Sequence, residues 1–342
     1  MRPSPFLLPS EPLRFRKMTS SGTIDFSQYE AAKQVVAVLD ISQQGLLTMV
    51  GDDALDLLHR LSTQDLASLA VGEGAATILT TDKGRILDSI VVQRYPDHVL
   101  LQISPGNQSR VLEWFDKYTI MEDSVASDAT SLHGQLLVFG PNAAGTIARS
   151  VPVASDLALY HHAQTNMAGV PVSVSRVEAP VGKGFHILMK PGHLEAVRQT
   201  LVDTGALPIN QDTFEVIRVE AGQPGFESEF DDRFNPHEVG LGDHISYTKG
   251  CYIGQEVIAR LDTYDKVQRH LRGLRLLTGN PVNVESELLV NGKVIGVVTS
   301  TALSPAFGNI ALAFLKKASS GPGTRLTTDT GTTIEVIALP FS

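Results

Sequence analysis

The segment KGCYIGQE, residues 249–256, contains the only cysteine of the 342-residue chain, Cys251. A helix is predicted to begin near Tyr252, so Cys251 would stand at its N-terminus, where unpaired N–H groups stabilise an anion. Lys249 adds a positive charge nearby, and both effects favour the thiolate form of the cysteine. A thiolate can attack an electrophile or bind a metal ion.

The predicted helix rests on apolar residues four positions apart. Ile253, Val257 and Leu261 would form a stripe that faces the core. Gly250 and Gly254 carry no side chain, which permits close approach by a ligand or by another backbone segment. The segment therefore combines a reactive atom with room around it.

Other interpretations of the cysteine remain open. A lone cysteine can be a small buried hydrophobe. One cysteine supplies only part of a zinc or iron–sulfur site, so such a site would have to be shared with another molecule. The histidines His161, His162, His186 and His193 lack the i, i+4 spacing of metal ligands. The sequence also contains no Walker A, G-x-S-x-G or H-E-x-x-H motif, which leaves the common nucleotide and hydrolase chemistries without support.

The composition indicates a soluble globular protein, because 42% of the residues are hydrophobic and 19% are charged. A net charge of -9 without clusters of Lys and Arg argues against a nucleic-acid partner. No uncharged apolar run approaches the roughly 18 residues of a membrane span. One cysteine cannot form an intrachain disulfide, so we expect a reducing, cytoplasmic location.

The N-terminal segment is treated separately. Residues 1–17 are rich in Pro, Arg and Ser and lack the apolar stretch of a secretory signal. We expect residues 1–24 to be a disordered tail or an extended N-terminus, with Met18 as an alternative start. If residues 1–17 are instead a transit peptide, the location is an organelle.

Helices that alternate with hairpins indicate an α+β fold rather than a doubly wound parallel sheet. A three-stranded meander is predicted with turns at 82–84 and 96–97. The long stretch 221–251 has little periodicity, and such loops are usually functional. Predicted helices cover 27–35, 54–66, 108–117, 193–204 and 213–220, and predicted strands cover 75–81, 85–95, 98–104, 135–141 and 184–190.

After Leu271 the chain consists of short predicted strands, and Asn291-Gly292 is a strong two-residue hairpin signal. Closing these strands into a small barrel would hide their exposed edges. We therefore expect a C-terminal β-barrel over residues 270–342.

Four segments together resemble the YgfZ family of folate-binding proteins, whose mitochondrial relatives assist iron–sulfur cluster assembly. They are KGCYIGQE and the segments 61–92, 218–241 and 294–315. The likeness covers most of residues 25–340, and the chain is similar throughout to the glycine-cleavage aminomethyltransferase. The resemblance implies three domains around a central cavity: residues 25–50 plus 150–265, residues 51–149, and the barrel.

The resemblance also implies a folate site. Asp88 matches the carboxylate that lies near the reacting folate nitrogen in the aminomethyltransferases, and Ser89 stands where those enzymes often have a second acid. In the GFH sequence, His186 replaces a glutamate that hydrogen-bonds the pterin ring. Lys83 and Arg85 are expected to attract the carboxylates of the folate.

The function that the resemblance implies is assembly or repair of iron–sulfur clusters by a tetrahydrofolate-binding protein, with tetrahydrofolate or a one-carbon derivative in the cavity. Cys251 would be the functional thiolate and a transient cluster ligand, with Lys249 lowering its pKa. Tyr252, Gln255 and Glu256 would shape the site. The expected partners are iron–sulfur scaffold or carrier proteins and cluster-dependent enzymes, and no permanently bound metal is expected.

Two alternatives belong to other classes. The chain could be a folate-dependent aminomethyl- or methyltransferase in which Asp88 positions the one-carbon unit. It could also be a folate-binding module without chemistry, in which Cys251 is only a packed small residue.

Overall fold

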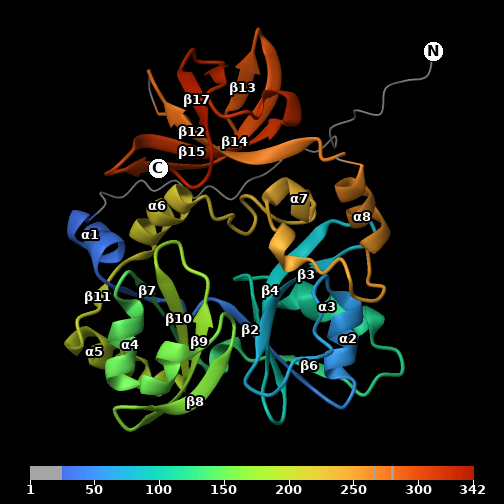
Figure 1. Ribbon diagram of the computed structural model, residues 1–342, viewed down its shortest axis with the longest axis vertical. Coiled ribbons are helices and arrows are strands. Elements are labelled where there is room, and N and C mark those ends of the chain that lie inside the picture. The colour runs from blue at the N-terminus through green and yellow to red at the C-terminus, as the bar shows by residue number, and fades with distance from the viewer. Residues whose placement is uncertain (1–24, 265, 279–280) are drawn as a thin grey trace.

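Two open β-sheets and one closed barrel form the computed structural model, which describes residues 25–264, 266–278 and 281–342. Figure 1 shows the barrel above the two sheets, which lie side by side. The predicted α+β fold and the C-terminal barrel are confirmed. The predicted tail, residues 1–24, lies outside the described residues.

The first sheet runs in the order β11-β1-β7-β10-β9-β8. Successive residues of a strand face opposite sides. Val38 and Leu136 therefore pack toward α4 and α5, whereas Leu39 and Leu137 pack on the side of α1 and α6. The strands are β1 (Ala37–Asp40), β7 (Gly134–Gly140), β8 (His162–Met167), β9 (Val170–Val177), β10 (Lys183–Met189) and β11 (Leu207–Pro208). The helices are α1 (Phe26–Gln34), α4 (Ala143–Ser150), α5 (Leu194–Asp203) and α6 (Gln211–Ala221).

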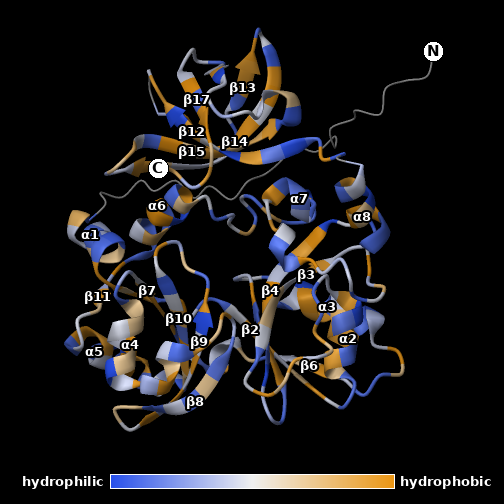
Figure 2. Cartoon of the chain, viewed as in Figure 1, coloured by the Kyte–Doolittle hydropathy of each residue, from blue (hydrophilic) through white to orange (hydrophobic). Residues whose placement is uncertain are grey.

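The second sheet runs in the order β3-β4-β5-β2-β6, and every neighbouring pair is antiparallel. Leu57 and Leu61 of α2 and Phe115 of α3 pack on one face, as their helical spacing predicts. Figure 2 shows hydrophobic and hydrophilic residues interleaved along the strands. The elements are β2 (Gly45–Val50), α2 (Ala54–Leu61), β3 (Gly74–Thr80), β4 (Ile86–Arg94), β5 (Val99–Ile103), α3 (Gln108–Tyr118) and β6 (Val125–Asp128).

The short connection between β1 and β2 crosses from the first sheet to the second. β2 lies within the predicted range 25–50 but pairs with β5 and β6 of the second sheet. β7 lies within the predicted range 51–149 but pairs with β1 and β10 of the first. Strand pairing thus divides the chain near residues 41–44 and again before residue 134, rather than at residues 50 and 149.

The barrel closes in the order β12-β15-β14-β13-β16-β17 around its own core. Asn291 and Gly292 have φ of 50° and 72°, which confirms the predicted two-residue hairpin between β13 and β14. The strands are β12 (Arg269–Leu276), β13 (Glu287–Val290), β14 (Lys293–Ser304), β15 (Gly308–Lys316), β16 (Arg325–Thr328) and β17 (Thr333–Ile337).

A buried ionic network attaches the barrel to α6. Arg218 donates to the Glu229 carboxylate at 3.0 Å and to the Ser300 hydroxyl of β14 at 2.9 Å. Ser300 in turn donates to Glu229 at 2.7 Å, and Glu229 is fully buried. Part of the long stretch that follows α6 therefore serves to join two units. The same stretch contains α7 (Pro236–Val239) and leads to α8 (Gln255–Thr263).

Candidate functional site

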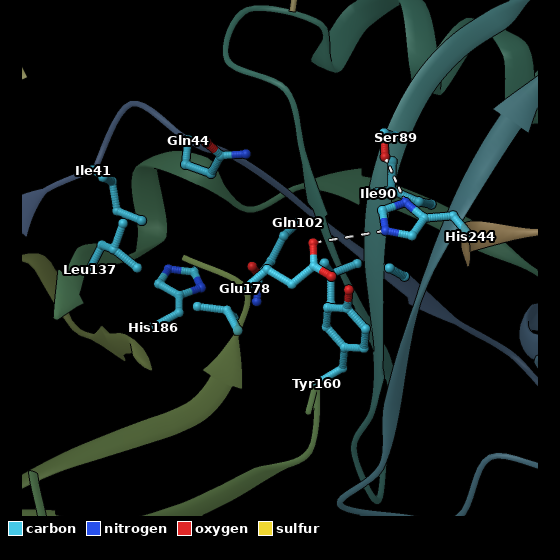
Figure 3. A pocket seen from close by; sticks show the side chains of 13 residues that line it. Ile41, Gln44, Ser89, Ile90, Gln102, Leu137, Tyr160, Glu178, His186 and His244 are labelled. Atoms are coloured by element: carbon cyan, nitrogen blue, oxygen red, sulfur yellow. Dashed lines mark hydrogen bonds and ion pairs between the residues drawn. The ribbon is translucent and has the colours of Figure 1, made fainter. Parts of the chain in front are cut away.

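A cavity of about 200 Å³ lies between the two sheets and is lined by residues of both (Figure 3). β3, β4 and β5 form one wall, and β7, β9 and β10 form the other. The polar residues that line it are Gln44, Ser89, Gln102, Tyr160, Glu178, His186 and His244. These side chains come from segments far apart in the sequence, so only the fold brings them together.

His244 lies between Ser89 and Glu178 (Figure 3). Its Nδ1 is 3.4 Å from Ser89 Oγ, and its Nε2 is 3.9 Å from a Glu178 oxygen. Burial lowers the pKa of His244, while Glu178 and Asp243 oppose that shift. The three side chains form a polar row at the cavity wall.

Glu178 is the only carboxylate among the residues that line this cavity, and its side chain is 56% exposed. It therefore marks the open side of the cavity. Burial, followed by the charge of Glu178, raises the pKa of Tyr160. Tyr160 also has a φ of 67°, in the left-handed backbone region that non-glycine residues adopt at an energetic cost.

His186 stands on β10 and is 1% exposed. Its Nε2 is 3.1 Å from Gln135 Oε1, whereas its Nδ1 is buried and makes no hydrogen bond with the described part of the chain. Burial, followed by the charge of His133, lowers the pKa of His186 to about 3. His186 thus lines the cavity with a neutral imidazole, one nitrogen of which has no described hydrogen-bond partner.

Asp88, expected beside the folate, is buried on β4 but is not among the residues that line the cavity. Its carboxylate accepts hydrogen bonds from the Ser104 backbone and hydroxyl groups and from the Asn107 side chain, at 2.6 to 3.1 Å. Burial raises the pKa of Asp88 to about 6, although these bonds oppose the shift. The cavity instead receives Ser89, because successive residues of a strand face opposite sides.

Lys83 and Arg85, expected to attract folate carboxylates, lie at the β3–β4 turn and outside the cavity lining. Lys83 is exposed. Arg85 donates to the Arg233 carbonyl at 3.1 Å and lies 3.6 Å from the Glu238 carboxylate. The structure therefore does not bring these two cations to the cavity.

Lys249 is buried and anchors the octapeptide to the C-terminal end of α2. Its ammonium donates to the carbonyl oxygens of His59, Ser62 and Gln64, the last two at 2.8 Å. Lys249 Nζ also lies 5.3 Å from the centre of the Tyr252 ring, which is buried in the core. The three N–H donors of Lys249 are thus used by backbone carbonyls.

The helix predicted to begin near Tyr252 begins at Gln255, with Gly254 as its N-cap at φ 84°. Cys251 therefore lies three residues before the N-cap instead of at the N-terminus of the helix. Its side chain is exposed. The predicted stripe is also wrong, because Val257 is 38% exposed and Ile258 is the fully buried residue. The reason is a tertiary contact: Thr80 Oγ1 donates to the Ile253 carbonyl at 2.6 Å and holds that residue outside the helix.

The other predicted members of the site lie beside Cys251 in the chain. Gln255 is half-buried and Glu256 is exposed, and both lie in the first turn of α8. None of the residues 249–256 lines the cavity between the sheets. Two regions that were predicted from the sequence as one site, the cavity between the sheets and the octapeptide, are therefore separate in the structure. In the described ranges no group of three or more His, Cys, Asp and Glu residues could hold a metal ion.

Sequence reasoning missed Glu178, Tyr160, Gln135 and His244. The only signal was for His244, which lies in the aperiodic stretch that was predicted to be functional. The other three stand in or beside strands, where an isolated polar residue resembles any solvent-facing position. No described helix is long and apolar enough to cross a membrane.

Two known domain families together match most of the chain. The GCVT N-terminal domain family matches residues 9–249, and the glycine cleavage T-protein C-terminal barrel domain family matches residues 269–342. A chloroplastic candidate transferase from Arabidopsis thaliana is 32% identical over 89% of this chain and 70% of its own length. An aminomethyltransferase from Streptomyces avermitilis is 28% identical over 92% of this chain and 88% of its own.

Among solved structures, the glycine cleavage system aminomethyltransferase T from Bartonella henselae superimposes with a TM-score of 0.82. The match covers 92% of this chain and 89% of that one at 22% identity, which shows a shared fold. The chain therefore belongs to the family that combines a GCVT N-terminal domain with a glycine cleavage T-protein C-terminal barrel domain.

Proposed function

We propose that the chain binds tetrahydrofolate or a one-carbon derivative, with the pterin ring in the cavity between the sheets. The observation that carries this proposal is the pair of acceptors there: the unused Nδ1 of buried His186 and the carboxylate of Glu178. A pterin presents an amino group and a ring N–H on one edge. His186 Nδ1 is a buried acceptor without a described partner, which favours a ligand that supplies such donors, and Glu178 adds an exposed carboxylate at the open side of the cavity.

The size of the cavity also favours the pterin ring as the part of the folate that enters it. Sites for whole drug-sized ligands usually measure roughly 300–1,000 Å³. A cavity of about 200 Å³ suits a bicyclic ring. The tail of the folate, with its carboxylates, would then extend outward past Glu178.

Calorimetric titration with tetrahydrofolate tests the proposal. We expect a single site per chain, and we expect His186→Leu to weaken binding while the protein stays folded. Absence of binding by the wild-type protein at millimolar tetrahydrofolate would contradict it.

Within this function we propose a YgfZ-type role in assembly or repair of iron–sulfur clusters, served by Cys251. The support is that Lys249, Tyr252 and Gly254 all have packing roles in the octapeptide, whereas Cys251 is exposed on the anchored segment. An exposed sulfur can meet a partner protein, which a shared cluster requires. The partners would be scaffold or carrier proteins and cluster-dependent enzymes.

The variant Cys251→Ser tests this role, because it removes a soft ligand and nearly preserves volume. It should fold and bind tetrahydrofolate as the wild type does, yet fail to restore cluster-dependent enzymes in a strain that lacks the native protein. Full restoration by the variant would exclude a thiol mechanism.

The second candidate is a folate-dependent aminomethyl- or methyltransferase. It is favoured by the aminomethyltransferases among the relatives. Against it stand His186 and Ser89, which occupy positions where the resemblance to those enzymes implies acids. Measuring release of a one-carbon unit to tetrahydrofolate from an aminomethylated carrier protein separates the two candidates.

Two locations follow from the sequence, the cytoplasm and an organelle. The Arabidopsis relative is named as chloroplastic, which supports the organelle for this chain. Fusion of residues 1–24 to a fluorescent protein distinguishes them, since only a transit peptide would carry the fusion into an organelle.

A further inference from the structure

A chain of hydrogen bonds leads from the β1–β2 connection to the cavity. The side-chain nitrogen of Gln135 donates to the backbone carbonyl of Gln44 at 2.6 Å. The side-chain oxygen of Gln135 lies 3.1 Å from His186 Nε2. A carbonyl can only accept, so the amide of Gln135 must direct its NH₂ group to Gln44 and its oxygen to His186.

This orientation determines where the proton of His186 resides. The Gln135 oxygen can only accept, so His186 Nε2 must carry the hydrogen and donate it. In a neutral imidazole the other nitrogen then has a lone pair. Burial keeps the ring neutral at physiological pH, since it lowers the pKa of His186 to about 3. Nδ1 is therefore a permanent acceptor.

We propose that the chain Gln44–Gln135–His186 fixes His186 as a hydrogen-bond acceptor and so selects a ligand ring whose edge donates N–H groups. The assignment of that ring as a pteridine rests on the proposed function. In this arrangement His186 touches the ligand and Gln135 is a positioning residue that does not line the cavity.

Selection follows from the cost of an unsatisfied acceptor. A donor edge pairs with Nδ1, which is buried and has no described partner. A ring with methyl groups on that edge leaves Nδ1 unpaired. Glu178 lies at the open side of the same cavity, where its carboxylate is exposed and 3.9 Å from His244, so the selection rests on Nδ1.

The first test uses the ligand-free protein with ¹⁵N-labelled histidine. Long-range ¹H–¹⁵N spectra should show His186 as the Nε2–H tautomer alone. Gln135→Leu should abolish this single tautomer. Gln102→Leu removes another buried glutamine of the cavity that does not contact His186, and it should leave the tautomer unchanged. An Nδ1–H tautomer in the wild-type protein would overturn the proposal.

The second test adds pterin, then 1,3-dimethyllumazine, which has the same bicyclic ring without N–H donors on that edge. Pterin should shift the Nδ1 resonance upfield and bind at least tenfold more tightly than the dimethylated ring. If pterin binds without shifting Nδ1, or if both rings bind equally, the proposal is refuted. If the tautomer is as expected but neither pterin nor tetrahydrofolate binds, the acceptor assignment stands and the folate function fails.

Discussion

Gly254 lies directly against Gly84, so that the N-cap of α8 and the β3–β4 turn meet backbone to backbone. A methyl group on Gly254 would come within 2.5 Å of the Thr81 carbonyl oxygen and 3.1 Å of Gly84 Cα. The contact therefore leaves no room for a side chain on Gly254. It attaches the octapeptide to the second sheet beside Cys251.

Gly254→Ala should therefore destabilise the protein. The left-handed backbone of residue 254 and the clash with Thr81 together should cost about 1–3 kcal/mol in the free energy of unfolding, measured with urea. Gly250→Ala is the matched control, because a methyl group there meets nothing within 4 Å, and it should change stability by less than about 0.5 kcal/mol. Equal stability of the two variants would contradict the contact.

Lys249→Met should also destabilise the protein. It removes the charged donor from three carbonyl groups at the end of α2, for which about 1.5–3 kcal/mol is expected. Urea denaturation measures the loss. Reaction of Cys251 with an aromatic disulfide should be unchanged in the folded variant. A clear fall in thiolate fraction would instead support the electrostatic role that the sequence predicted for Lys249.

Asp88 should make stability depend on pH. Burial raises its folded-state pKa from 3.8 to about 6, so the folded protein holds the proton more tightly than the unfolded chain. The free energy of unfolding should therefore fall as the pH rises from about 4 to 6, by roughly 3 kcal/mol from this residue alone. Urea denaturation of the wild type and of Asp88→Asn at pH 4 and pH 7 measures this loss of stability. If the free energies of unfolding of the two proteins differ by the same amount at both pH values, the raised pKa of Asp88 is refuted.

The same variant tests the folate role of Asp88. Because its carboxylate is held by Ser104 and Asn107, Asp88→Asn should leave tetrahydrofolate affinity unchanged. A tenfold or greater loss of affinity in the folded variant would return Asp88 to the binding site, as the family resemblance implies.

Glu178→Gln should weaken tetrahydrofolate binding. Loss of a charge-assisted hydrogen bond costs about 1.5–3 kcal/mol, or roughly ten- to a hundredfold in affinity. Calorimetry measures the change, with Glu195→Gln on α5 as the control, since that exposed carboxylate pairs only with Arg198 among the described residues. Similar affinities for the two variants would remove Glu178 from the site.

Arg218→Met should destabilise the attachment of the barrel to α6. It leaves the buried Glu229 carboxylate without its cation, which typically costs 3–5 kcal/mol. Adding Glu229→Gln should recover part of that loss, because the uncompensated charge disappears. Thermal unfolding of the single and double variants checks both steps, and a double variant less stable than Arg218→Met would contradict the explanation.

The sequence predicted the elements well because their signals are local. The spacing of Leu57 and Leu61 predicts α2, and Asn291-Gly292 predicts a hairpin that the backbone angles confirm. The start of α8 was predicted too early for a physical reason: Ile253 is held by Thr80 from another strand, a tertiary contact that periodicity cannot reveal.

The cavity could not be predicted from such signals. Glu178, His186 and His244 come from three separate segments, and their closeness depends on two sheets that meet across the β1–β2 connection. The octapeptide was singled out for its possible chemistry, but much of its pattern is explained by packing. Lys249 and Gly254 attach the octapeptide to the end of α2 and to the β3–β4 turn, a packing role that spacing alone does not reveal.

Gln44 links the relative position of the two sheets to the hydrogen bonds of His186. Its side chain donates to the Ile103 carbonyl of the second sheet, while its own carbonyl accepts from Gln135 of the first. A hinge motion about residues 41–44 would break one of these bonds and release the amide of Gln135 to rotate. The imidazole proton of His186 could then move to the other nitrogen. Opening of the molecule and loss of ligand selectivity would thus be a single event, and the tautomer would report which conformation is populated.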